Sequence, residues 1–407
     1  MSPSVPPPPS APPGPRSVRP APVLGAASFS AMASDPSAIV AAIREARATL
    51  TQPSGAVIFA SGSLVEAAER TLLVARRELG DIPIILGSSA GVLTERGEHE
   101  GSSAVSGLVW QGGVVSPIFV PPRSEKDTAG DILTDRVATA LGDASGTVIL
   151  LAQPQGFSPR TLDSLARFSA HATIIGGGTL PGGAWISMPD QKRLQSEAKP
   201  QQGEAVGLVV RGIARPVVRT SSACRLLSPL LPITEVRGAM VFRLGDRPAL
   251  EVLSESTHDL SGRPLVLAIL ARNEDDKGAR GGMLVRGIRG VDSGRKSVVI
   301  AEEAAPGMLM AFGICDANAS RADLSATTRE LSRQMAGAAP QFGLLISCAG
   351  RGSGLYGERD VDSRIVRERF PNVPFAGMFS SFEIGPLGDR TAMHLYTGVV
   401  AMFGAPS

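Results

Sequence analysis

The stretch FGLLISCAGRG, residues 342–352, contains the pattern that decides the fold. Its apolar run leads directly into a turn of small residues, and a charged, helix-like segment follows at residues 361–370. A second apolar run, VPFAGM (373–378), then ends in two serines and the isolated acid Glu383. Two short strands joined by a helix, each ending in a turn that carries polar groups, are typical of α/β proteins that bind ligands at their strand ends.

The same order of elements recurs earlier in the chain. Two upstream blocks also run strand, helix, strand and small-residue turn, with GSSAG (87–91) and GGGTLPGG (176–183) as their turns. These two blocks start roughly 90 residues apart, which is too long a period for a solenoid repeat. We therefore predict an α/β fold with two lobes, mixed β-sheets, flanking helices and internal duplication. The alternative is that short apolar α/β units resemble one another by chance.

The composition narrows the function classes. With 407 residues, the chain is long enough for two domains. A net charge of +2 gives no electrostatic footprint for nucleic acid. No apolar stretch reaches membrane-spanning length, and the start does not resemble a secretion signal. The three cysteines, Cys224, Cys315 and Cys348, are far apart and imply no disulfide framework, so a reducing, cytoplasmic setting is expected.

Several local expectations follow from the order of residues. Residues 1–34 are rich in proline and predict a disordered tail, and Met32 is a candidate translation start. The charged segment 95–100 predicts an exposed loop. The segments 103–110 and 114–120 alternate like two strands that pair with each other.

Six segments of the chain form a recognisable series of motifs: SCAGRG (347–352), VPFAG (373–377), EIGP (383–386), GSSAGVLTERGEHE (87–100), LLAQPQGFSPRTLDSL (150–165) and GDRPALEVL (245–253). Together these segments resemble the FIST family of sensor proteins. The resemblance implies a FIST N-terminal domain at residues 35–235 and a FIST C-terminal domain at 236–407. It also implies a cytoplasmic, non-enzymatic sensor of a small ligand, with amino acids as the ligand class. No output domain is evident, so such a sensor would signal through a partner protein in trans.

The two upstream turns supply candidate ligand contacts. Ser88 and Ser89 follow a strand, where backbone N–H groups could cradle an anion. The alternative is a tight turn of small residues. Gly177 and Gly178 also end a strand, and they allow close approach either by a ligand or by another backbone.

The third turn supplies charged candidates. Arg351, in a glycine-rich turn with Gly352, could hold a ligand carboxylate with both prongs of its guanidinium group, and Glu383 could hold an amino group. Together these side chains suit a zwitterion such as an amino acid. The alternative is a structural ion pair of Glu383 with Arg351 or with Arg272.

The alternative function is that of a cysteine-dependent hydrolase or transferase with Cys348 as its nucleophile. A nucleophilic cysteine needs a nearby base, and His394 could reach Cys348 only through the fold. Otherwise Cys348 is a small buried hydrophobic residue. The four histidines are scattered without zinc-ligand spacing, so we predict neither a metal site nor a cofactor.

Overall fold

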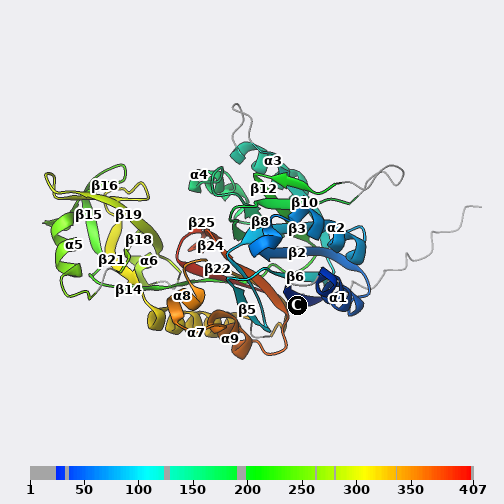
Figure 1. The fold of residues 1–407 in the computed structure, drawn as a ribbon. Helices are drawn as coiled ribbons and strands as arrows, with labels where there is room; N and C mark the ends of the chain where they lie inside the picture. The colour runs from blue at the N-terminus through cyan, green and yellow to red at the C-terminus, as the bar shows by residue number, and fades with distance from the viewer. Residues whose placement is uncertain are drawn as a thin grey trace, which may run out of the picture.

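The computed structural model divides the protein into a large body and a smaller β-barrel, which lie at the right and the left of Figure 1. The body combines helices with mixed sheets, and the barrel consists mainly of strands, so the predicted two-lobed α/β fold is confirmed. The structure describes residues 24–32, 36–122, 129–189, 199–261, 264–278, 281–335 and 337–404.

Three α/β units with one order of elements build the body, so the predicted internal duplication is present in three copies. The first unit comprises β1 (Gly25–Met32), α1 (Pro36–Ala48), β2 (Pro53–Ser61), α2 (Ala68–Leu79), β3 (Ile84–Ser89), β4 (Gly91–Thr94), β5 (Gly97–Glu100) and β6 (Ala104–Gln111). The second comprises β7 (Val114–Val120), α3 (Ala129–Leu141), β8 (Gly146–Ala152), α4 (Pro159–Asp163), β9 (Ala172–Gly178), β10 (Ala184–Ser187), β11 (Gln201–Gly203) and β12 (Ala205–Arg211). The third comprises β13 (Val217–Ser222), α7 (Ala317–Gln334), β22 (Pro340–Cys348), α8 (Gly352–Tyr356), α9 (Val361–Arg369), β23 (Phe375–Ser380), β24 (Glu383–Leu387), β25 (Arg390–His394) and β26 (Thr397–Gly404).

The strands of each unit pair in the same way. The central strand lies parallel to the strand after the second helix, as in β2–β3, β8–β9 and β22–β23. On its other side it lies antiparallel to the last strand of the unit, as in β2–β6, β8–β12 and β22–β26.

The barrel is inserted into the third unit, between β13 and α7. Its elements are β14 (Cys224–Leu226), β15 (Leu231–Arg237), β16 (Met240–Leu244), β17 (Arg247–Pro248), α5 (Ala249–Thr257), β18 (Val266–Ala271), α6 (Glu274–Gly278), β19 (Leu284–Asp292), β20 (Ser297–Ile300) and β21 (Leu309–Cys315). Because β21 pairs with both β15 and β18, the order β21-β15-β16-β20-β19-β18 closes on itself. Closure leaves these six strands without a free edge.

The hairpin of each unit extends the sheet of a different unit. Hairpin β4–β5 of the first unit pairs with β23 of the third, β24–β25 of the third pairs with β9 of the second, and β10–β11 of the second pairs with β3 of the first. The three six-stranded sheets of the body are therefore linked in a cycle. The small-residue turns that suggested a binding site are the places where the chain leaves one sheet for the next.

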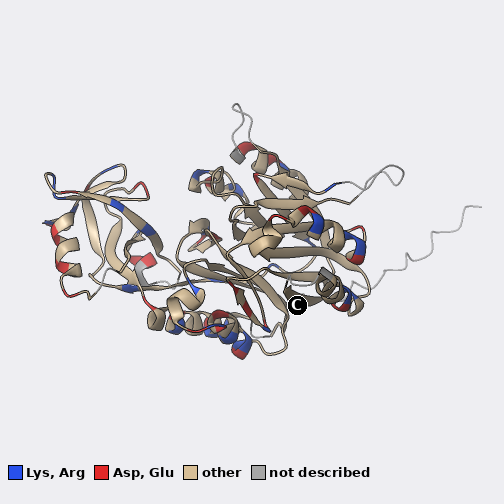
Figure 2. Ribbon diagram, viewed as in Figure 1, with Lys and Arg blue, Asp and Glu red and all other residues tan. Residues whose placement is uncertain are grey.

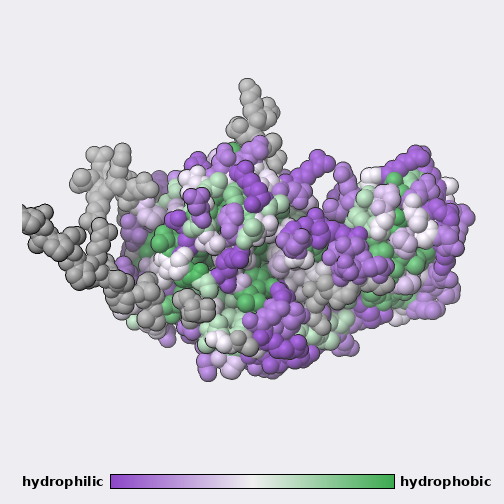
Figure 3. Space-filling model, turned by 180° about the vertical axis from the view of Figure 1, so that it is seen from behind, coloured by the Kyte–Doolittle hydropathy of each residue, from purple (hydrophilic) through white to green (hydrophobic). Residues whose placement is uncertain are grey.

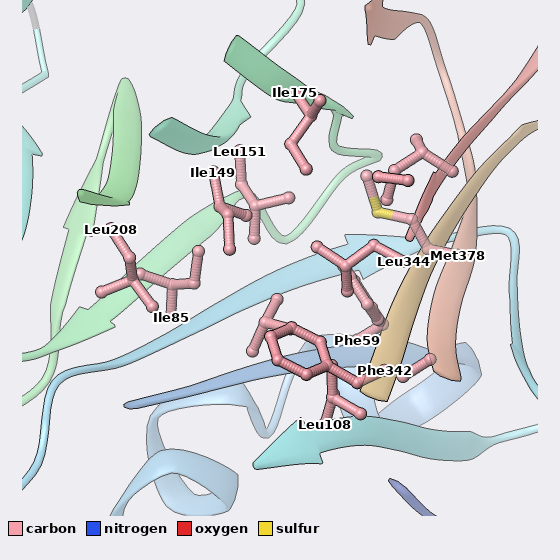
Figure 4. Packing of buried hydrophobic residues seen from close by; sticks show 14 of the residues in the cluster. Phe59, Ile85, Leu108, Ile149, Leu151, Ile175, Leu208, Phe342, Leu344 and Met378 are labelled. Carbon is pink, nitrogen blue, oxygen red and sulfur yellow. The ribbon is translucent and has the colours of Figure 1, made fainter. Parts of the chain in front are cut away.

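The inner faces of the three sheets meet in one apolar core. Figure 4 shows residues from all three sheets converging there, including Phe59, Leu108, Leu151, Ile175, Phe342 and Leu344. The helices cover the outer faces: α1 and α2 the first sheet, α3 and α4 the second, and α7 and α9 the third. Burial on both faces explains why the central strands have nearly continuous apolar sequences.

The predicted disordered tail, residues 1–34, is too long. Residues Gly25–Met32 form β1, which pairs with β6 along its whole length and buries Phe29. A chain that began at Met32 would lack this strand and would leave an edge of β6 unpaired. The proline-rich residues 1–23 lie outside the described part of the chain.

Two predictions for residues 95–120 are wrong. The segments expected to pair lie in different sheets, because the turn at Gly112 and Gly113, with φ of 96° and 73°, carries the chain from the first unit into the second. The segment expected to be an exposed loop includes β5, where Glu98 is 6% exposed. Its carboxylate accepts a hydrogen bond of 2.8 Å from the N–H of Ser363 in the first turn of α9, where an anion is favoured.

The domain boundary expected between residues 235 and 236 lies inside strand β15 of the barrel. The chain instead passes between the two lobes at Ala223 and Asp316, where the Asp316 N–H donates to the Ala223 carbonyl at 2.9 Å. We call this crossing, with the strand ends beside it, the neck.

Candidate functional site

The predicted anion cradle at residues 87–91 contacts the exchanged hairpins. The Ser88 N–H donates to the carbonyl of Gly183 at 3.1 Å, and the Ser88 hydroxyl donates to that of Leu180 at 2.6 Å. The Ser89 hydroxyl donates to a backbone carbonyl of β2 at 3.1 Å. Both serines are buried, so carbonyl groups of the protein occupy the donors that we had assigned to a ligand.

The paired glycines admit another backbone, which is one of the two alternatives that the sequence left open. Gly177 lies opposite Glu383 in the β9–β24 ladder, and the Gly178 N–H donates to the carbonyl of Phe382 at 2.7 Å. A Cβ on Gly178 would lie 2.3 Å from both the Phe382 ring and the Ser381 hydroxyl. Glycine is therefore required here for β24 to join the second sheet.

Arg351 lies inside the third unit, with its side chain 1% exposed. Its Nε donates to Oδ2 of Asp362 at 2.8 Å, and its Nη2 donates to Oδ1 at 3.0 Å. The same carboxylate accepts hydrogen bonds of 2.6 Å from the hydroxyls of Ser347 and Tyr356. The two-pronged contact that we predicted with a ligand is therefore made with Asp362, a residue that the sequence reasoning missed.

Glu383 is fully buried at the start of β24 and accepts three hydrogen bonds. The Ser380 hydroxyl donates to it at 2.9 Å, and Thr397 donates through its hydroxyl at 2.7 Å and its N–H at 3.2 Å. Burial outweighs these donors and raises the pKa of Glu383 to about 8. Arg272, one of the expected ion-pair partners, pairs with Asp276 instead.

Cys348 is buried at the end of β22, and the geometry does not favour it as a nucleophile. Burial, followed by the charge of Glu383, raises the pKa of Cys348 to about 12. Its sulfur therefore stays protonated at neutral pH, whereas the thiolate is the reactive form. The His394 ring faces the carbonyl of Gly385 at 3.3 Å, and burial lowers the pKa of His394 to about 4.

Gly352 begins α8 with a φ of 67° and packs against the carboxylate of Glu100 from the first unit. That carboxylate accepts a hydrogen bond of 2.9 Å from the Ser353 N–H. The structure thus brings the predicted residues to the carboxyl ends of the parallel strands, where most of them make contacts within the protein itself.

A cavity of about 90 Å³ lies where the barrel meets the body. It is lined by α4 and β25 of the body, and by β19 and residue 302 of the barrel: Pro159, Leu162, Asp163, Leu284, Arg286, Glu302, Arg390, Thr391, Ala392 and Met393. The buried Nε of Arg390 has no hydrogen-bond partner among the described residues. A buried donor without an acceptor is costly, so Arg390 is the cavity-lining side chain whose hydrogen-bonding capacity is not met within the described residues.

Arg286 connects the lobes beside this cavity. Its side chain is 4% exposed, and its Nε lies 2.6 Å from a carboxylate oxygen of Glu302. Its Nη2 donates to the carbonyl of Met393 in β25 at 3.1 Å. The hairpin that contains β25 also places Leu387 in the apolar core of the barrel. The lobes therefore meet both at the neck and along this hairpin.

The surface gives few further indications of a partner. Basic and acidic residues are interspersed over both lobes (Figure 2), and polar residues separate the apolar patches on the reverse face (Figure 3). Within the described ranges, no helix has the length and apolarity needed to cross a membrane. In the same part of the chain, no three His, Cys, Asp or Glu side chains are grouped to hold a metal ion.

The fold and the cavity define a two-lobed α/β protein with a small polar site between its lobes, a common location for ligand binding. Sequence profiles of the FIST N domain and the FIST C domain match residues 55–247 and 249–386, so the chain belongs to the FIST family of signal-transduction sensor domains. The predicted family is confirmed. The two matches meet inside the barrel, so the family boundary does not separate the two lobes.

Mycobacterial proteins are among the relatives. An uncharacterized protein of Mycobacterium bovis is 27% identical over 362 residues, which cover 86% of this chain and 90% of the relative. An uncharacterized protein of Mycobacterium tuberculosis is 26% identical over 363 residues, which cover 86% and 91%.

Proposed function

We propose that the protein is a cytoplasmic sensor that binds a small, amino-acid-like carboxylate in the cavity between body and barrel and signals through a partner protein in trans. The observation that carries this proposal is the unpartnered, buried Nε of Arg390 at a cavity lined by both lobes. The FIST family of sensor domains supports it.

The cavity limits the ligand by charge and by size. A guanidinium group binds carboxylates through directed N–H donors, and Arg390 is the side chain with a donor to spare. The carboxylates of Asp163 and Glu302 line the same cavity and are suitable contacts for an amino group. A volume of about 90 Å³ is smaller than the cavity of about 150 Å³ that binds benzene in another protein, so only a small ligand fits.

Signalling follows from the position of the cavity. A ligand that contacts both lobes stabilises the arrangement in which they close around it, and the populations shift toward that arrangement. A partner protein that binds only one arrangement of the lobes then responds to the presence of the ligand. The three free thiols suit a reducing compartment, which supports the cytoplasm as the setting.

A thermal-shift experiment with Arg390→Gln tests the proposal. Amino acids and small carboxylates that bind are expected to raise the melting temperature of the wild type, because binding to the folded state stabilises it. The shift should be lost in Arg390→Gln and kept in Arg77→Gln, which alters an exposed arginine on α2. No shift with any compound of the panel, or an equal shift in Arg390→Gln, would overturn the proposal.

A further inference from the structure

All three cysteines, although far apart in the sequence, gather at the neck. Cys224 opens β14 and Cys315 ends β21, so they are the first and last residues of the barrel. They are direct partners in the β14–β21 ladder and are partly exposed. Cys348 is close to this pair: the space beside Gly350 is bounded by the Cys348 sulfur and by the ring of Tyr396, and the Tyr396 carbonyl accepts a hydrogen bond of 3.1 Å from the Ala223 N–H.

The local ladder puts Cys224 and Cys315 at the closest kind of cross-strand position. The adjacent pair, Ala223 and Asp316, is hydrogen-bonded, since the Asp316 N–H donates to the Ala223 carbonyl at 2.9 Å. Because hydrogen-bonded and non-hydrogen-bonded pairs alternate in antiparallel strands, the cysteine pair is non-hydrogen-bonded, with an expected Cα separation of about 4.5 Å. Disulfides need a Cα separation of about 4.4–6.8 Å.

We propose that Cys224 and Cys315 form a redox-sensitive dithiol that reacts with low-molecular-weight disulfides and closes into a cross-strand disulfide at the neck. This inference is independent of the proposed ligand. It identifies a modification site that ties the strand entering the barrel to the strand leaving it.

The two thiols have different roles in the reaction. The hydrogen bond from Cys224, together with the charge of Arg351, lowers the pKa of Cys315, whereas the same contact and burial raise the pKa of Cys224. The Cys315 thiolate therefore attacks one sulfur of the small disulfide, forms a mixed disulfide and releases one thiolate. Cys224 then loses its proton to solvent and attacks the Cys315 sulfur, and the second small thiolate leaves. The protein loses two electrons, and the reagent is reduced to two thiols.

Oxidised glutathione is the probe for a direct test on the full-length protein. After incubation and non-reducing digestion, mass spectrometry should find the Cys224 peptide linked to the Cys315 peptide, with Cys348 still a free thiol. Reduction should reverse the link. Linkage to Cys348, or no linked peptide when a small model dithiol in the same tube is fully oxidised, would overturn the proposal.

Single variants separate the two roles. In Cys224→Ser, glutathione should remain on Cys315 as a trapped mixed disulfide, whereas Cys315→Ser should react far more slowly. Cys348→Ser is the matched control and should form the Cys224–Cys315 link at the wild-type rate. Equal reaction rates of the two neck variants would contradict the assignment of Cys315 as the attacking thiol.

Discussion

Arg351 and Asp362 show what a sequence reveals about single residues and what it leaves open. The arginine stood out in its glycine-rich turn, but its partner lies in a helix of ordinary charged composition. Burial pushes the pKa of Asp362 upward, but the charge and hydrogen bonds of Arg351 outweigh it and hold that pKa below its usual value. Only the fold reveals that this pairing is satisfied inside the protein.

Arg351→Ala is expected to destabilise the fold instead of abolishing a ligand contact directly. Removing one partner of a buried ion pair leaves the other charge uncompensated and costs about 3–5 kcal/mol. The matched control is Arg44→Ala, which removes an exposed pair with Glu78 and should cost far less stability, because solvent screens the pair. Urea unfolding of the two variants makes the comparison, and equal losses of stability would contradict the structural role of Arg351.

Glu383 predicts a specific pH dependence of stability. In the folded protein its pKa is about 8, whereas an ordinary glutamate titrates near 4.5. Its contribution to stability is therefore complete below pH 4.5 and is lost as the pH rises through 8. The melting temperature of the wild type should fall more steeply between about pH 5 and about pH 8 than that of Glu383→Gln, because this interval lies between the unfolded and the folded pKa of Glu383. Parallel curves of melting temperature against pH for the two proteins would contradict this prediction. Glu98, whose pKa is raised to about 7, contributes a similar pH dependence to both proteins, so the comparison with Glu383→Gln removes it.

At the level of elements, local sequence patterns predicted where strands end, but they did not predict which distant strands pair. Alternation and small-residue turns identified the ends of β3, β9 and β23, because these signals lie within a few residues of one another. The partners of those turns come from other units, so nothing local indicated that the glycines receive a strand. The same limit explains why β6 and β7, adjacent in sequence, were expected to pair.

Gly178→Ala tests the exchange of hairpins between units. The added methyl group would lie 2.3 Å from the Phe382 ring, so β24 must move away from β9, at an expected cost of about 1–3 kcal/mol. Gly290→Ala is the matched control, because a Cβ there meets no atom within 4 Å. Thermal unfolding compares the two variants, and similar melting temperatures would show that the tight approach of β24 is not required.

For the whole molecule, the repeated α/β pattern predicted the duplication, whereas the inserted barrel had no local signal. Ring closure depends on β21 pairing with β18, and these two strands are separated in the sequence by α6, β19 and β20. The cavity between the lobes could not be predicted either, because it also depends on contacts between distant segments. Asp163, Arg286 and Arg390 come from three distant segments and meet only when the lobes pack together.

Because the barrel is inserted into the third unit between β13 and α7, we predict that it can be removed without unfolding the body. Ala223 and Asp316 are hydrogen-bonded neighbours at 2.9 Å, so a two-glycine link replacing residues 224–315 should leave the three sheets intact. The shortened chain should also carry Leu387→Ser, because excision exposes this side chain. Hydrogen exchange should show β2, β8 and β22 still protected, and loss of that protection would mean that the body needs the barrel to fold.

Binding by the shortened chain tests the central claim most directly. Calorimetric titration should compare the full-length protein with the folded, barrel-less body, using the amino acid or carboxylate that gives the largest thermal shift. Because the proposed cavity is lined by both lobes, we expect binding by the full-length protein and none by the body alone. Equal affinity in both proteins would place the ligand elsewhere and contradict a sensor that works by closing the barrel against the body.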